Sequence, residues 1–173
     1  MAPDQDTDKK AVEALKKACD DAYATYSCDC SHAVWYILKQ LADKDTQWLE
    51  ANQLMHTLST NSSAWKEVSV DEGWALAQKG IVVVGGLQAK GHGHVIVIYP
   101  GEKIDSGGYL YTYTDKKTNT QKTDTLRSHG KYPRALSGSL GSWPGAKSKG
   151  DKTVWDPWAD DDKFANVTFW TKS

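Results

Sequence analysis

Two uninterrupted runs of β-branched residues constrain most strongly what this chain can fold into. The runs are Ile81–Val84 and Val95–Ile98, and a glycine-rich segment separates them. Apolar runs without polar alternation are typical of strands buried on both faces, so both runs predict central strands of a sheet. The Gly91-His92-Gly93-His94 segment predicts a tight loop that ends where the second strand begins.

Helical patterns come before these strands, and further strand patterns come after them. Apolar residues at helical spacing predict helices over 9–26, 30–41, 51–58 and 71–79. Strands are expected at 109–114, 135–140 and 167–170. Polar or exposed loops are expected at 115–124 and 142–155, and a solvated turn at 160–162. Helices first and strands later favour an α+β domain over an alternating α/β one. We expect a single domain over residues 9–173 and a flexible tail over residues 1–8.

Length and charge exclude several classes of protein. The chain has 173 residues, enough for one domain whose core needs no disulfide or structural metal. It has 21 Lys and Arg against 22 Asp and Glu, so its net charge of -1 lacks the electrostatic footprint of a nucleic-acid binder. No run reaches the roughly 20 apolar residues that a membrane span needs. Residues 1–8 lack the apolar core of a signal peptide, so action outside the cytoplasm would need another export route.

Aromatic and cysteine residues are unusual in number. The chain has eight Trp and eight Tyr but only two Phe. Rings with a polar edge suit a sugar or peptide groove, although core packing is expected to account for most of them. The three cysteines are Cys19, Cys28 and Cys30, so at least one thiol is free or intermolecular, while a bond between Cys19 and Cys28 stays open. No second cysteine pair completes a metal cage, and we expect no metal or cofactor.

The strongest chemical signal is the Asp29-Cys30-Ser31 segment at a predicted helix start. Asp29 suits the N-cap position, which puts Cys30 in the first turn, where backbone N–H groups favour the thiolate. His94, at the start of a central strand, can supply the base that a thiol nucleophile needs. The alternatives are a small buried Cys and a hydrogen-bonded turn histidine. Together the two residues match the Cys–His arrangement of thiol hydrolases.

Two short motifs carry a family resemblance. The Asp29-Cys30-Ser31 helix start and the Gly93-His94-Val95 strand start resemble the NlpC/P60 peptidases, which are papain-like enzymes. A narrower similarity, over roughly residues 10–170, is to the type VI secretion amidase effectors of the first family; it is carried by Ala51-Asn52, Gly80–Leu87, Gly93–Val97, Lys131–Pro133, Ser137–Ser139 and Val154-Trp155. The resemblance implies a papain-like α+β fold, with N-terminal helices packed on a central antiparallel sheet.

The resemblance also implies an activity and its partners. It implies a toxin that is made in the cytoplasm, is loaded directly by the type VI secretion machinery and acts in the periplasm of a target bacterium. The expected substrate is the peptidoglycan stem peptide, cut between D-glutamate and meso-diaminopimelate, and a cognate immunity protein would block the groove. No nucleic acid and no membrane insertion are expected. Two other hypotheses stay open: a housekeeping or phage NlpC/P60 hydrolase, and a non-catalytic wall- or peptide-binding module.

Carried over residue by residue, the resemblance makes Cys30 the nucleophile and His94 the general base and later acid. The ring-orienting position falls near Ser137, where the family offers a main-chain carbonyl. The Cys30 N–H would donate to the oxyanion.

Substrate contacts are expected from residues around this pair. Asp29 and Ser31 flank the nucleophile, His92 is expected on the loop rim, and Trp143 lies in a glycine-rich loop. Trp155 and Trp158 are further candidates for the groove. In place of the Gly of the family's Asp-Cys-Ser-Gly stands His32, which indicates an altered groove wall.

Overall fold

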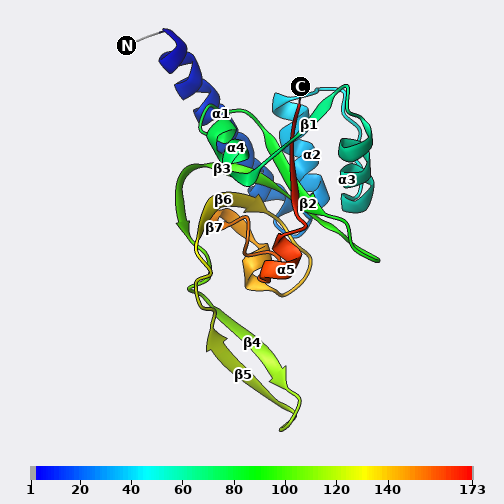
Figure 1. Cartoon of the computed structure of the whole chain (residues 1–173), viewed down its shortest axis with the longest axis vertical. Coiled ribbons are helices and arrows are strands. Elements are labelled where there is room, and N and C mark those ends of the chain that lie inside the picture. Colours follow the sequence, from blue (N-terminus) through cyan, green and yellow to red (C-terminus); the bar gives the residue numbers. More distant parts are fainter. Residues whose placement is uncertain (1–2, 173) are drawn as a thin grey trace.

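The computed structural model describes residues 3–172 as five helices, one short 3-10 helix and eight strands (Figure 1). In chain order these are α1 (Pro3–Tyr26), α2 (Cys30–Leu41), α3 (Ala51–Thr60), β1 (Trp65–Val68), α4 (Val70–Ala77), β2 (Val83–Leu87), β3 (His94–Asp105), β4 (Leu110–Asp115), β5 (Thr120–Thr125), β6 (Lys131–Ser137), η1 (Pro144–Ala146), β7 (Ser148–Thr153), α5 (Asp161–Phe164) and β8 (Thr168–Lys172).

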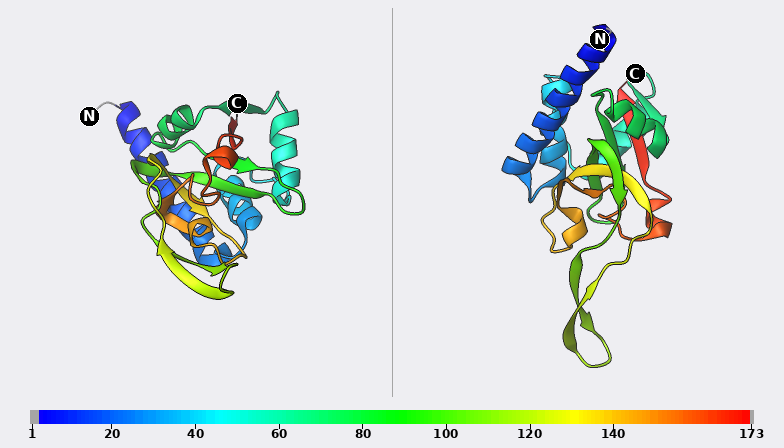
Figure 2. Two further views of the ribbon diagram at one scale, coloured as in Figure 1. Left: turned by 60° about the horizontal axis from the view of Figure 1, so that its bottom comes forward. Right: turned by 90° about the vertical axis from the view of Figure 1, so that its left-hand side faces the viewer.

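A six-stranded antiparallel sheet forms the centre of the domain. Its strand order is β1-β8-β2-β3-β6-β7, so β2 and β3, the strands that hold the β-branched runs, pair with each other in the middle. Strand β2 begins at Val83, so Ile81 and Val82 precede it. Helices α1 and α2 lie on one side of this sheet and α4 on the other (Figure 2). None of the described helices is long and apolar enough to cross a bilayer.

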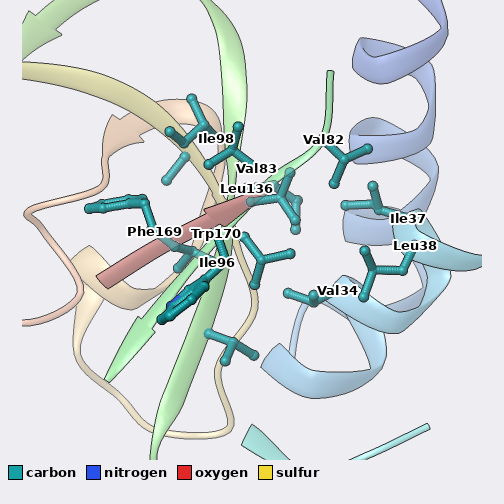
Figure 3. Packing of buried hydrophobic residues seen from close by; sticks show 14 of the residues in the cluster. Val34, Ile37, Leu38, Val82, Val83, Ile96, Ile98, Leu136, Phe169 and Trp170 are labelled. Carbon is teal, nitrogen blue, oxygen red and sulfur yellow. The ribbon is translucent and has the colours of Figure 1, made fainter. Parts of the chain in front are cut away.

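The core lies between α2 and the central strands. Val34, Ile37 and Leu38 project from α2 toward the sheet (Figure 3), and Val34 and Ile37 are fully buried. On the other face, Gly73 of α4 lies where a Cβ would sit 3.0 Å from Ile98, which lets that helix approach the sheet closely. The α+β class and the central strands predicted from sequence are therefore confirmed.

Three expected loops or turns form regular elements instead, and one strand was not expected. The stretch 115–124, expected as a polar loop, contains most of β5, which pairs with β4 although every residue of β5 is exposed. The expected exposed loop over 142–155 contains η1, β7 and the fully buried Trp155. Asp160 caps the short helix α5 where a turn was expected. Strand β1 was not predicted.

The physical reason is that these segments carry no apolar periodicity, and contacts made by the folded chain order them. Strands β1 and β7 pair with β8 and β6, β5 forms a hairpin with the preceding strand β4, and Asp160 caps α5. At the N-terminus, α1 begins at Pro3, so residues 3–8 continue the helix where a tail was expected. Residues 1–2 of that tail lie outside the described part.

Candidate active site

The start of α2 holds the candidate nucleophile. Asp29 is the N-cap: its Oδ1 accepts hydrogen bonds from the His32 backbone N–H at 3.1 Å and from the Ser31 hydroxyl at 3.0 Å. These bonds fix Cys30 as the first helical residue. The backbone N–H groups of Cys30, Ser31 and Val95 face the Cys30 sulfur. Because Val95 follows His94 on β3, the sulfur lies beside the strand that carries the candidate base.

The loop that leads into His94 is held by Asn52 of α3. The Asn52 amide donates to the Ala89 carbonyl at 2.8 Å, and the Ala89 N–H donates back to Asn52 Oδ1 at 3.0 Å. A Cβ on Gly93 would lie 2.3 Å from the same Oδ1, so only glycine fits between this clamp and His94. Sequence reasoning did not assign this role to Asn52, because an exposed-looking Asn in a helix carries no signal of a partner 37 residues away.

A buried serine orients the His94 ring. His94 Nε2 lies 2.8 Å from Ser137 Oγ, and Ser137 Oγ lies 2.7 Å from the Ala146 carbonyl oxygen. A carbonyl can only accept, so the single hydroxyl proton of Ser137 goes to Ala146, and Ser137 accepts from the ring N–H. This places the ring proton on Nε2 and leaves the Nδ1 lone pair available as the base. The rings of Trp158 and His94 form a T-shaped contact, with their centroids 5.5 Å apart.

The position of Ser137 agrees with the expectation, but the group that makes the contact does not. The resemblance implied a main-chain carbonyl as the partner of the ring, whereas the partner here is the Ser137 side-chain hydroxyl. Its own acceptor, the Ala146 carbonyl, belongs to η1, whose existence was not predicted. The side chain of Ser137 is fully buried, so water does not compete for these bonds.

Cys30 and His94 line one groove of about 830 Å³. Four other predicted residues line the same groove: Asp29, Ser31, His92 and Trp143. His92 is exposed and lies on the loop, as expected for a rim residue. Trp158 lines the groove as well, whereas Trp155 is fully buried and is not among its lining residues.

Burial favours the uncharged form of both central groups. Desolvation raises the pKa of the Cys30 thiol, and the N–H groups of Val95, Ser31 and Cys30 do not offset it. Desolvation also lowers the pKa of His94 to about 4. The N–H groups at the helix start favour the thiolate, as expected, but burial outweighs them and the thiol pKa is raised. The site rests as a neutral thiol beside a neutral imidazole, and the proton has to move as the sulfur attacks.

His32 forms part of an aromatic wall beside the nucleophile. Its ring stacks with the ring of Tyr26, at a centroid distance of 5.5 Å, and with that of Trp48, at 4.6 Å. Its Nδ1 forms a hydrogen bond with Asp29 Oδ2. Trp48 donates its indole N–H to the Ser31 hydroxyl at 3.1 Å. His32 therefore holds the N-cap in place, and the Ser31 hydroxyl is engaged within this wall.

The other two cysteines lie in different surroundings and are not bonded to each other. Cys19 is fully buried in α1, and burial raises the pKa of its thiol. Cys28 is exposed, with the Lys147 ammonium 3.8 Å from its sulfur. Among residues 3–172, no three His, Cys, Asp or Glu side chains are grouped in a way that could hold a metal ion.

Comparisons with known proteins give no direct identification. No family model matches the chain. No curated protein matches it either. Inference about function therefore depends on the geometry of the groove and on the motifs that line it.

Proposed function

We propose that this protein is a cysteine amidase with a papain-like NlpC/P60 fold that hydrolyses peptidoglycan stem peptides at the γ-D-glutamyl–meso-diaminopimelate bond. The observation that carries the proposal is the joint placement of Cys30 and His94 in one groove. The Ser137 hydroxyl oxygen, 2.8 Å from His94 Nε2, holds the ring in place. A thiol, a base and a group that orients the base are the three parts of a thiol hydrolase. The motif resemblance supplies the substrate class.

In the proposed reaction, His94 Nδ1 takes the Cys30 proton as the sulfur attacks the γ-glutamyl carbonyl carbon. The N–H groups of Cys30 and Ser31, which face the sulfur, donate to the oxyanion that forms. His94 then gives its proton to the leaving amine of diaminopimelate, and a thioester remains. Water attacks the thioester while His94 accepts its proton. The glutamyl carboxylate leaves, and the proton returns to the Cys30 sulfur.

The proposal extends to how the enzyme reaches its substrate. The resemblance to type VI secretion amidase effectors supports delivery into the periplasm of a target bacterium and protection of the producer by an immunity protein. An open groove of about 830 Å³ with Cys30 inside it offers such an inhibitor a direct target. Expression of the protein in the periplasm, with and without a candidate inhibitor, tests this part.

The test of the activity is the identity of the products. Purified protein is incubated with bacterial sacculi, and the soluble fragments are analysed by mass spectrometry. We expect new carboxyl termini at D-glutamate and new amino termini at diaminopimelate. Fragments cut at another bond would show that the enzyme cleaves that bond instead of the proposed one. Intact sacculi, and intact isolated stem peptides, would contradict the amidase proposal.

The pH dependence of cleavage follows from the two shifted pKa values. Desolvation lowers the pKa of His94 to about 4, so the ring stays neutral and able to accept a proton until the pH falls toward that value. The Cys30 pKa lies above the ordinary thiol value of 9.0, so the thiol stays protonated up to that pH. We expect kcat/KM for a soluble stem peptide to be nearly constant between about pH 5 and about pH 9.

Thermal unfolding measured over the same pH range separates loss of activity from loss of fold. A fall in kcat/KM with an apparent pKa near the ordinary imidazole value of 6.5, in protein that is still folded, would contradict a desolvated His94.

A further inference from the structure

A two-stranded hairpin extends from the body of the protein next to the groove. Strands β4 and β5 pair only with each other and not with the six-stranded sheet. They project away from the sheet, at the end of the molecule opposite the N-terminus (Figure 1). Nearly all of their residues are exposed. A hairpin of this kind leaves both of its faces available to a ligand.

One face of the hairpin carries aromatic rings next to hydrogen-bonding groups. The rings of Tyr111 and Tyr113 stack with their centroids 5.6 Å apart. The rings of Trp143 and Tyr111 form a T-shaped contact with their centroids 5.5 Å apart. Their cross-strand partners on β5 are Asp124 and Lys122. The Tyr113 hydroxyl donates to Asp124 at 2.9 Å. Ring faces bordered by carboxylate, ammonium and hydroxyl groups suit a pyranose, which offers C–H groups on its faces and hydroxyls on its edge.

A buried carboxylate fixes this surface relative to the groove. The Asp156 side chain accepts from the Gly107 N–H at 2.8 Å and the Tyr109 hydroxyl at 2.9 Å, at the root of the hairpin. The Asp156 carbonyl accepts from the Trp143 indole at 2.8 Å. A Cβ on Gly145 would lie 2.3 Å from both that carbonyl and the Tyr109 hydroxyl, so glycine is needed where these groups meet. Trp143 is therefore held in place before any ligand arrives.

We infer that Tyr111, Tyr113 and Trp143 form an aromatic platform that binds the glycan strand of peptidoglycan. The inference rests on the proposed function. Trp143 lines the groove of Cys30 and also touches Tyr111, so the platform is continuous with the groove. In the proposed substrate two amino acids separate the scissile bond from the sugar, which is at least about 7 Å of extended chain. A stem peptide bound in the groove therefore brings its sugar to the neighbourhood of the platform.

Binding of peptide-free glycan tests the platform without any cleavage. Glycan strands stripped of their stem peptides are titrated into Cys30→Ala protein in a calorimeter. We expect the double variant Tyr111→Ala/Tyr113→Ala, in the same background, to raise the Kd about tenfold or more, because two stacking rings are lost. Tyr111→Phe/Tyr113→Phe keeps the rings and is expected to stay within about threefold of the parent.

The matched control lies on the opposite face of the hairpin. Leu110 is 64% exposed and Thr112 is also exposed, and both point away from the tyrosines. Leu110→Ala/Thr112→Ala is therefore expected to bind the glycan as the parent does. Circular dichroism shows whether each variant keeps its fold.

Several results would overturn the platform. These are failure of the parent to bind the glycan, equal binding by Tyr111→Ala/Tyr113→Ala, or equal loss of binding in the control. These results do not depend on catalysis. Glycan binding through the tyrosines in a protein that leaves sacculi intact would keep the platform and contradict the amidase.

Discussion

Replacement of Cys30 by alanine is expected to lower the rate of stem-peptide cleavage by about 10⁴-fold or more, because in the proposed reaction the sulfur forms the bond on which both half-reactions depend. The fold should survive, because Cys30 is only partly buried and its helix start is fixed by Asp29. The measurement is kcat/KM on a soluble stem peptide, together with thermal unfolding. Residual cleavage near the wild-type rate would end the thioester mechanism.

Cys30→Ser is the matched control for shape. The serine hydroxyl fills nearly the same space, but an imidazole with a pKa of about 4 is a weak base for a hydroxyl proton. This variant should therefore be nearly as inactive as Cys30→Ala.

Alkylation by iodoacetamide gives a second readout of Cys30. In a Cys28→Ser background, which removes the exposed thiol, Cys30 should react well before the fully buried Cys19. Equal protection of both thiols would favour a non-catalytic binding module.

The pair at the centre of the site was predictable because each member carries a local signal. Asp29 before a helical pattern marks a cap, and His94 before a β-branched run marks a strand start. Both signals depend on a few neighbouring residues. The central strands were predictable from their uninterrupted β-branched runs, and the first four helices from apolar residues at helical spacing.

What was not predictable depends on contacts that only the folded chain makes, most of them between distant segments. The hydroxyl of Ser137 faces His94 from 43 residues away, and its second partner lies in η1. The direction of the Cys30 pKa shift depends on burial by the folded chain, whereas the helix start alone indicates the opposite direction. Strand β5 has no apolar face and is ordered by its pairing with β4. None of these features leaves a periodic or local pattern in the sequence.

Replacement of Gly138 by alanine is expected to affect both stability and activity, because this glycine lies where two parts of the site meet. Its position follows Ser137 directly, and a Cβ there would lie 2.4 Å from the Tyr26 carbonyl oxygen and 3.2 Å from that of Asp29. Both oxygens belong to the backbone before Cys30. The next residue, Ser139, donates its N–H to the Ser27 carbonyl at 2.9 Å. An added methyl therefore pushes the Ser137 segment away from the nucleophile.

The expected loss of stability is about 1–3 kcal/mol, the usual effect of overpacking against a backbone that cannot move aside. Displacement of Ser137 also releases the His94 ring, and a shift of about 1 Å in a catalytic group can lower the rate about 100-fold. Thermal unfolding and kcat/KM, measured on the same samples, report the two effects separately.

Gly141→Ala is the control within the same loop, because a Cβ there would meet nothing closer than the Ser139 hydroxyl at 3.6 Å. It should change the unfolding free energy by less than about 0.5 kcal/mol. Gly138→Ala could instead match this control in both stability and rate. That result would show that close packing of the Ser137 segment against the start of α2 does not align Cys30 with His94. If Gly138→Ala lost stability but kept its rate, the contact would serve the fold alone, and the orientation of His94 would depend on the Asn52 clamp and on Ala146 instead.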